Sequence, residues 1–591
     1  MTYKITRKWL AFAALGIAAI PTYADSAALT PGNLLVSRSV YTGDASTVTI
    51  GEKLPPNCPA TAKCPKDAAT DNGAFPSLTN TNNVWNNDNV DASFGVTTPI
   101  FLDQITTSGT PVSTLSVPTS LVVTSFSSKS ELALNLSADG KFITFMGYSA
   151  PPNTLDASNS NTPLVNDPTN PVSTAFYREV VQLDNLGNFQ VTDTNAYGGN
   201  NGRAAILADG FYYLTGNTNN GSGTPANLVN STGVEIASPG RSPSTEPAQI
   251  GDFSVTQYGY KADKAGKDNN FRGLAVFGNT LYVTKGSGSN GINTVYQVGN
   301  IGILPTLATA ANTPITILPG FPTALAKNAD ATFIYPFGIW FANANTLYVG
   351  DEGDGNAADA ATSTTAGLQK WSLINGTWKL DYVLQNGLNL GVPYGVANYP
   401  TSLNPATDGL RNISGKVNGD GTVSIYAVTS TVSANGDQGA DPNKLVTIKD
   451  VLANTTAAGA ASETFTTLKA AGYKEVLRGV CFTPGTNLNV PLSLPVTASG
   501  LLYNRRTQTF TGTVTVTNNT SAAVSGPLMV ILANLTPGVT LTNSALTVNG
   551  SPAISLGSQI LAPGQSAVAT VVFSNPSNAP INFTPEVVPE S

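Results

Sequence analysis

The chain has 591 residues, of which 41% are hydrophobic and only 11% are charged, and its net charge is −7 with a pI near 4.8. An acidic chain with no basic stripe is a poor partner for nucleic acid, because phosphate binding needs a basic surface. The sequence contains no histidine. This excludes Ser-His-Asp and Cys-His catalytic systems and His-ligated zinc, copper or iron, so any catalysis would use other side chains or an oxygen-bound cation.

Residues 1–24 have the pattern of a secretory signal peptide. An apolar run over 9–20 follows the basic residues Lys4, Arg7 and Lys8. A cleavage site is expected after Ala24. The run is short for a membrane span, and no later segment is apolar for long enough. We therefore expect a secreted, periplasmic or cell-surface protein.

A long loop over 43–99 follows the first predicted strand and contains Cys58 and Cys64 among prolines. In an exported protein a local disulfide between them is the natural interpretation, and two free thiols are the alternative. Cys481 lies in an apolar strand and is expected to be a buried core residue.

A repeated unit organises most of the chain. Each copy has an apolar strand, a turn, a second strand, a long polar loop and two further strand candidates. The copies can be aligned on the residue before the first strand, at intervals of 65 to 74 residues. The aligned residues are Glu131, Arg203, Arg272, Phe337, Arg411 and Arg478. A constant period with four strands per unit predicts a β-propeller over residues 25–485.

The last copy has only one strand, over 478–484, before the pattern changes. Three strand candidates within 33–118 would complete it, since an open edge would leave unpaired backbone groups. We therefore predict a six-bladed propeller that is closed by one composite blade. Seven blades is the alternative, if 388–405 contains a degenerate unit.

From residue 486 to 591 the strands become shorter and evenly spaced, as in TFTGTVTVTN. Alternation with one apolar face predicts a β-sandwich of about a hundred residues. The LAPGQS turn before an alternating strand resembles the Ig-like or fibronectin-like modules of secreted bacterial proteins. Such modules act as spacers or attachment domains.

In period and strand pattern, residues 33–484 resemble secreted bacterial propellers of the NHL and gluconolactonase-like architecture. That group includes calcium-dependent lactonases and phosphotriesterases as well as binding scaffolds. The resemblance brings no catalytic signature, so it assigns no site residue.

The six aligned residues are expected to surround the mouth of the central channel. Four are arginines, and guanidinium groups suit the recognition of carboxylate, phosphate or sulfate. An anion-binding funnel would use Arg203, Arg272, Arg411 and Arg478, with Glu131 as a counter-charge and Lys285 on the same face. Alternatively, each arginine bonds carbonyls of a neighbouring blade and fastens the ring.

The long loops that leave second strands are expected on the same face. They are rich in Asn, Ser, Thr and Gly, a composition suited to sugars or polar surfaces, or simply to solvent. These loops span 148–175, 215–245, 285–294, 351–366 and 430–443. Asp351, Glu352 and Asp354 in one of them could supply oxygens to a structural Ca²⁺.

Three functions fit these observations. The first is a secreted or surface protein that binds a glycan, a small anion or another protein, with no catalytic activity. The second is a calcium-dependent propeller hydrolase or lactonase. The third is a structural component of the envelope or matrix.

Overall fold

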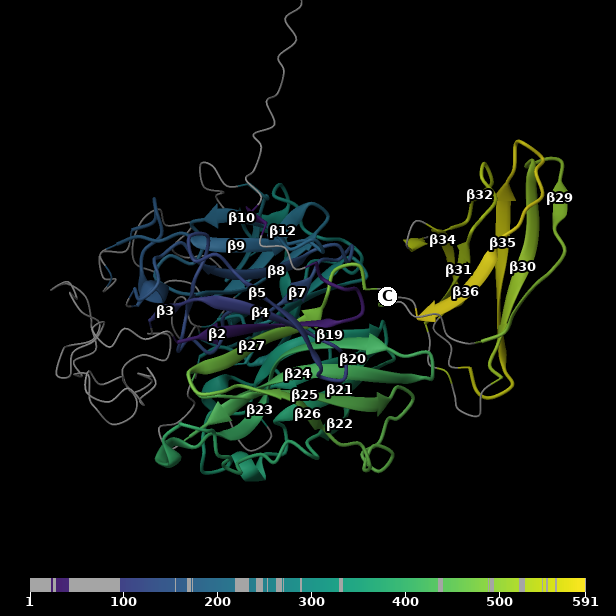
Figure 1. Ribbon diagram of the computed structural model, residues 1–591. Coiled ribbons are helices and arrows are strands. Elements are labelled where there is room, and N and C mark those ends of the chain that lie inside the picture. The colour runs from purple at the N-terminus through teal and green to yellow at the C-terminus, as the bar shows by residue number, and fades with distance from the viewer. Residues whose placement is uncertain are drawn as a thin grey trace, which may run out of the picture.

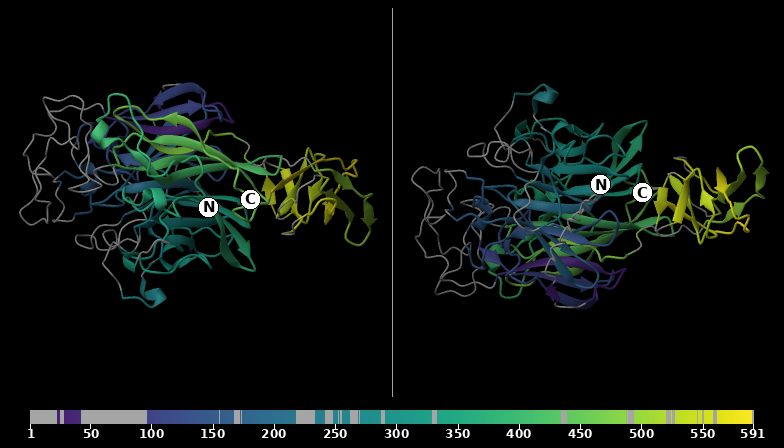
Figure 2. Two further views of the ribbon diagram at one scale, coloured as in Figure 1. Left: turned by 90° about the horizontal axis from the view of Figure 1, so that it is seen from below. Right: turned by 90° about the horizontal axis from the view of Figure 1, so that it is seen from above.

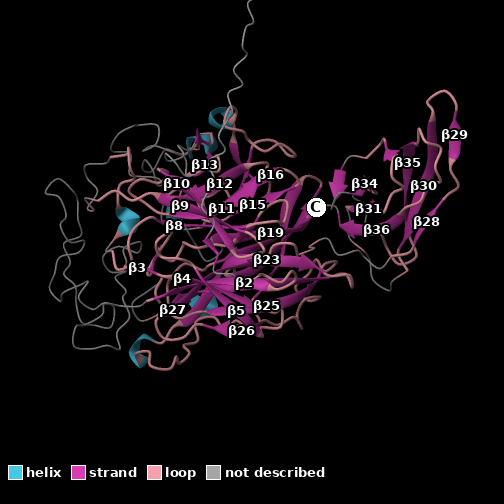
Figure 3. Cartoon of the chain, turned by 45° about the horizontal axis from the view of Figure 1, so that its top comes forward, coloured by secondary structure: helices cyan, strands magenta, loops and turns pink. Residues whose placement is uncertain are grey.

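The computed structural model shows an all-β protein with a large body of sheets and a smaller C-terminal unit (Figure 1). The structure describes residues 23–24, 28–41, 96–154, 156–166, 172, 174–217, 233–240, 248–251, 253, 255–261, 268, 270–286, 290–328, 333–433, 439–486, 488, 494–519, 524, 527–544, 546–548, 551–557 and 561–589. Helical structure in these residues is limited to short 3₁₀ turns in the loops (Figure 3). These turns are Ala157–Asn159, Val255–Tyr258, Ala310–Asn312, Ala326–Asn328, Ala360–Thr362 and Thr401–Leu403.

The large body contains five antiparallel sheets whose four main strands follow one another in the chain. The first has β7 (Asn135–Leu136), β8 (Ile143–Tyr148), β9 (Arg178–Leu183) and β10 (Asn188–Thr194), with β1 (Tyr23–Ala24) beside β10. The second has β11 (Gly202–Ala208), β12 (Phe211–Gly216), β13 (Val234–Ala237) and β14 (Ala248–Gln249). The third has β15 (Leu274–Phe277), β16 (Thr280–Lys285), β17 (Thr294–Val298) and β18 (Ile315–Ile317). The fourth has β19 (Pro336–Asn343), β20 (Thr346–Asp351), β21 (Gly367–Ile374) and β22 (Thr377–Leu384), and the fifth has β23 (Ala406–Val417), β24 (Thr422–Val432), β25 (Lys444–Val451) and β26 (Thr466–Ala470).

A sixth four-stranded sheet joins the two ends of this body. Its order is β27 (Glu475–Phe482), β2 (Leu34–Val40), β4 (Ile100–Ile105) and β5 (Pro111–Ser116). Leu35 stands opposite Cys481, so the N-terminal strand pairs with the last strand of the body. This is the composite sheet that the incomplete last repeat predicts, and Cys481 is buried in it. Two short strands, β3 (Thr97–Thr98) and β6 (Thr124–Ser125), pair with each other, and in the chain they come just before β4 and just after β5.

The first strands of the six sheets succeed one another around a closed ring. β7 contacts β11, β11 contacts β15, and the series continues through β19, β23 and β27 back to β7. Residues 388–405 contain a 3₁₀ turn and isolated bridges but no strand. The described part of the chain therefore has no seventh four-stranded sheet in this body.

Glycines in the first strands allow neighbouring strands to approach closely. A Cβ at Gly273 would lie 2.1 Å from the carbonyl oxygen of Phe337, and one at Gly479 would lie 2.5 Å from that of Leu132. Both contacts are with backbone of the next sheet, which cannot move without opening the ring. In the pairs Arg272-Gly273 and Arg478-Gly479, the glycine thus permits the close approach of two sheets, and the arginine carries the charge.

We expect Gly273→Ala to lower the free energy of unfolding by about 1–3 kcal/mol, because the added methyl overpacks the contact with Phe337. Gly395→Ala is the matched control, since a Cβ there meets nothing within 4 Å. Urea unfolding followed by tryptophan fluorescence measures both variants. All five tryptophans precede residue 379, so this signal does not report on the C-terminal unit. Equal stability of the two variants would contradict the close approach.

The C-terminal unit is formed by two sheets around their own core (Figures 1 and 2). One sheet has β28 (Val496–Ala498) and β29 (Leu502–Asn504) on β30 (Thr509–Thr517), followed by β35 (Ser566–Ser574) and β32 (Thr540–Leu541). The other has the order β33 (Leu546–Val548), β34 (Ser551–Ser555), β31 (Leu528–Ala533) and β36 (Thr584–Pro589). Val514, Val516, Val530 and Phe573 are fully buried between them.

Some predictions fall on residues that the structure does not describe. Cys58 and Cys64 lie in 42–95, and most of the signal-peptide segment lies in 1–22. The disulfide and the signal peptide therefore stay predictions. Among the described residues, no helix has the length and apolar character needed to cross a bilayer.

Candidate functional site

The aligned residues come together at the ring, but the first strands begin earlier than the sequence indicates. Arg203, Arg411 and Arg478 lie inside β11, β23 and β27, whereas Arg272 precedes β15. All four arginines are at most 5% exposed. The apolar pattern located the strands correctly but placed their starts too late, because backbone pairing continues through these buried charges.

Arg478 fastens neighbouring sheets to one another. Its Nη2 donates to the carbonyl of Phe126 in the loop before β7 and, at 2.7 Å, to that of Gly439. Its Nε lies 3.4 Å from Ser39 Oγ on β2. Arg478 thus has the contacts expected of an arginine that fastens the ring.

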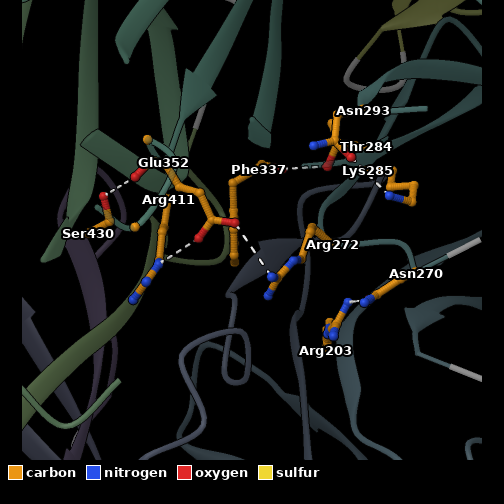
Figure 4. Close-up of polar contacts among 12 residues, drawn as sticks. Arg203, Asn270, Arg272, Thr284, Lys285, Asn293, Phe337, Glu352, Arg411 and Ser430 are labelled. Carbon is orange, nitrogen blue, oxygen red and sulfur yellow. Dashed lines mark hydrogen bonds and ion pairs between the residues drawn. The ribbon is translucent and has the colours of Figure 1, made fainter. Parts of the chain in front are cut away.

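Arg272 and Arg411 share one carboxylate (Figure 4). Arg411 Nε lies 3.0 Å from Glu352 Oε2, and Arg272 Nη2 lies 3.6 Å from Glu352 Oε1. The Arg272 guanidinium also lies over the Phe337 ring at 5.8 Å. Ser430 Oγ donates to the Glu352 carbonyl at 2.6 Å, which holds the loop that carries this carboxylate. Glu352 therefore connects the third, fourth and fifth sheets.

Glu131 is buried in a different set of contacts. Its carboxyl accepts from Thr124 Oγ1 at 3.0 Å and from the Ser125 amide at 3.1 Å, and it bonds the Tyr148 hydroxyl. Burial raises the pKa of Glu131 and raises that of Tyr148 well above its ordinary value. In the described part of the chain, Glu131 forms no ion pair with any of the four aligned arginines, so it is a poor counter-charge for them.

Arg203 differs from the other ring arginines. Its Nη1 donates to Asn270 Oδ1 and, at 2.8 Å, to the Phe271 carbonyl of the next repeat (Figure 4). Its Nε is buried and has no hydrogen-bond partner among the described residues, and its Nη2 donates to none of them. No described carboxylate forms an ion pair with it. One edge of a buried guanidinium is therefore unused.

The electrostatic surroundings of Arg203 are unfavourable to its charge. Burial, followed by the nearby charge of Arg272, lowers the pKa of Arg203 well below its ordinary value, and Glu352 and Glu131 oppose this effect. Removing an ion from water costs several kcal/mol unless partners replace the lost hydration. Since no ion-pair partner for Arg203 is found among the described residues, its charge is only partly compensated by Glu352 and Glu131.

Lys285 lies at the end of β16, where its Nζ donates to Asn293 Oδ1 at 2.9 Å (Figure 4). The side chain is completely buried. It thus connects the end of β16 to the residue immediately before β17.

The three acidic residues of the predicted calcium loop do not converge. Asp351 accepts from the amides of Tyr335 and Gly353 and from Gln369 Nε2, whereas Glu352 binds the two arginines. Asp354 is exposed. Among the described residues, no group of three or more acidic or cysteine side chains could hold a metal ion. The donor set present does not fit Ca²⁺, which takes six to eight oxygens.

Asp351 is expected to make stability depend on pH. Burial raises its pKa from 3.8 to about 7, so the folded protein keeps a proton that the unfolded chain releases. The stabilisation is complete below pH about 4 and is lost as the pH rises through about 7, with a slope of about −1.4 kcal/mol per pH unit in between. We expect Asp351→Asn to remove this slope, as measured by urea unfolding between pH 5 and 6.5. Parallel curves for the two proteins would contradict the burial of a protonated carboxyl.

Two buried clusters were not predicted from the sequence. Arg178, the first residue of β9, is fully buried and donates to five backbone carbonyls and to Ser160 Oγ. The accepting carbonyls belong to Ser158, Ser160, Phe176, Tyr197 and Asn200, with Phe176 bound by Nη1 and the others by Nε or Nη2. Arg178 therefore joins the loop before β9 to the loop before β11. The sequence signal for it is its position directly after a long polar loop, at the start of a strand that is not the first of its sheet.

The second cluster lies between the fourth and fifth sheets. Lys370 Nζ on β21 lies 2.8 Å from Asp450 Oδ2 on β25 and also donates to the Tyr382 hydroxyl at 2.9 Å. Tyr382 donates to Asp450 Oδ1 at 2.6 Å, and Tyr348 donates to the same carboxylate. Lys370 and Asp450 are almost completely buried. Eighty residues separate them in the chain, so no local pattern indicates the pair.

Comparison with known proteins assigns no family. No family model matches the sequence, and no curated protein matches it. Among solved structures, the exo-β-1,3-galactanase from Phanerochaete chrysosporium with β-1,3-galactotriose aligns over 77% of this chain and 94% of its own, with 10% identity and a TM-score of 0.29. A glycoside hydrolase family 43 arabinoxylan arabinofuranohydrolase from Bacillus subtilis, in complex with cellotetraose, aligns over 66% and 95%, with 11% identity and a TM-score of 0.20. TM-scores this low carry no conclusion about fold or activity.

Proposed function

We propose that this chain is an exported binding protein that holds an anionic group of its ligand at the centre of a six-bladed propeller. The six four-stranded sheets would be the blades, and the C-terminal unit would be an Ig-like module that spaces or attaches them. The observation that carries the proposal is Arg203, a buried guanidinium whose Nε–Nη2 edge has no partner in the described structure. A carboxylate, phosphate or sulfate fits that edge with two parallel hydrogen bonds.

The surrounding charges support an anion rather than a cation. Arg272 adds to the positive potential near Arg203, and Glu352 is already shared between Arg272 and Arg411. An anion would supply the missing negative charge in a site of low dielectric, where a charge pair is stronger than in water. A glycan, a small anion or an acidic side chain of a protein could each bring that group.

A calcium-dependent hydrolase is the weaker candidate. The carboxyls at the ring already have partners, since Glu131 bonds Thr124, Ser125 and Tyr148 and Glu352 bonds two arginines. In the described residues, no cluster of three or more acidic or cysteine side chains could hold the metal ion that such a hydrolase needs.

The proposal is tested by thermal unfolding of the mature chain in sulfate, phosphate and carboxylate buffers of equal ionic strength. We expect at least one anion to raise the melting temperature, because a ligand at 100 times its dissociation constant stabilises a fold by about 2.7 kcal/mol. The shift should disappear in Arg203→Met, persist in Arg505→Met on the exposed turn after β29, and weaken in Arg203→Lys, which keeps the charge without the fork. A shift that survives in Arg203→Met, or no shift with any anion, would contradict the proposal and favour a structural role.

A further inference from the structure

Two asparagines next to Arg203 also have unused hydrogen-bonding atoms. Asn201 immediately precedes β11, and Asn217 immediately follows β12, its partner strand. The two residues are held together by a backbone hydrogen bond, in which the Asn217 N–H donates to the Asn201 carbonyl oxygen at 3.1 Å. Asn201 is 2% exposed and Asn217 is 6% exposed.

In each of these two asparagine side chains, the Nδ2 atom forms a hydrogen bond and the Oδ1 atom has no partner. Asn201 Nδ2 donates to Ser128 Oγ at 2.9 Å, and Asn217 Nδ2 donates to Asn200 Oδ1 at 2.7 Å. The Oδ1 atoms of both are buried and accept no hydrogen bond from the described residues. Buried polar groups are almost always satisfied by protein, water or ligand, so each of these oxygens needs an explanation.

The backbone brings these oxygens to the same end of the sheet as the unused edge of Arg203. Arg203 lies two residues beyond Asn201 in the strand, at the point where the register between β11 and β12 shifts. A shift of this kind inserts one extra residue into one strand and changes the direction of its side chain. Two unsatisfied acceptors and one unsatisfied guanidinium edge are thus concentrated in one short stretch of backbone.

From this juxtaposition we infer that the ligand is a polyhydroxylated carboxylate, such as a sugar acid, alone or at the end of a glycan. The carboxylate would accept two hydrogen bonds from the Nε–Nη2 edge of Arg203, and hydroxyl groups would donate to Asn201 Oδ1 and Asn217 Oδ1. A hydroxyl both donates and accepts, so it would complement these amides in either orientation of the group. A simple anion would satisfy Arg203 but leave both amides unpaired. This inference rests on the proposed function and specifies its ligand.

The test compares three probes by isothermal titration calorimetry with the full chain. D-glucuronate carries both features, acetate carries only the carboxylate, and D-glucose carries only the hydroxyls. We expect glucuronate to bind about tenfold or more tightly than acetate, because hydrogen bonds to otherwise unpaired buried groups contribute about 1 kcal/mol or more each. We expect glucose to bind much more weakly than glucuronate.

Variants separate this inference from the proposed function. Asn217→Leu should reduce the affinity for glucuronate about tenfold and leave the affinity for acetate unchanged. Asn300→Leu, on the exposed turn after β17, should change neither, and Arg203→Met should abolish binding of both acids. If acetate and glucuronate bind equally and both depend on Arg203, the amides bind water, and the inference is wrong while the proposed function stands. If no acid shows binding that depends on Arg203, both are wrong.

Discussion

Replacing Asp450 with alanine is expected to lower the free energy of unfolding by about 3–5 kcal/mol, because Lys370 would stay buried without its counter-ion. The change also removes the acceptor of the Tyr348 and Tyr382 hydroxyls. Urea unfolding followed by tryptophan fluorescence reports this loss directly. Trp371 lies next to Lys370, and Trp378 lies in the same sheet.

An exposed ion pair supplies the control for Asp450. Asp420 and Lys449 lie 2.7 Å apart with more than half of each side chain in solvent. Asp420→Ala should therefore cost no more than about 1 kcal/mol. The double variant Lys370→Met with Asp450→Leu should recover most of the loss, since apolar side chains of similar size often replace a buried pair without cost. A small effect of Asp450→Ala would contradict the buried pair.

Arg178→Ala is expected to have an effect of similar size, about 3–5 kcal/mol, because it leaves several buried carbonyl groups without a donor. Burial lowers the pKa of Arg178 to about 10, so the guanidinium is charged at neutral pH in both states. The loss should be accompanied by faster proteolysis in the loop between β8 and β9, whose last residues Arg178 binds.

Two further variants test whether the effect is specific to the buried guanidinium of Arg178: the conservative change Arg178→Lys and the exposed control Arg505→Ala. Lysine can donate at most three hydrogen bonds, so we expect an intermediate loss of stability. Arg505 is exposed on the turn after β29, and its replacement should leave unfolding and proteolysis unchanged. If Arg178→Ala unfolds like the wild-type protein, water replaces the guanidinium, and the loops are ordered by other contacts.

The sequence predicted the sheets well because their signals are local. Apolar strands, short turns and a constant period locate each repeat, and the missing strands of the last repeat predict the pairing of β27 with β2. Such patterns reflect local backbone preferences and burial, so they can be recognised without knowing which distant residues will be in contact.

The polar network could not be predicted in the same way. Asp351 and Glu352 are adjacent at the end of β20, and successive side chains of a strand point to opposite faces, so two neighbouring carboxylates cannot readily share one cation. Long side chains add a further uncertainty. Arg203 and Arg478 occupy equivalent positions in their repeats, yet one leaves an edge unused and the other bonds two carbonyls. Lys370 and Asp450 meet only because two sheets lie side by side.

The presence of an anion beside Arg203 can be observed directly in crystals grown or soaked with selenate, whose selenium atom scatters anomalously. We predict an anomalous peak within hydrogen-bonding distance of Arg203 Nε and Nη2, and none there in crystals of Arg203→Met. Ordered water at that edge, with selenate bound only at exposed arginines such as Arg505 and Arg506, would contradict an anion site at the centre of the ring.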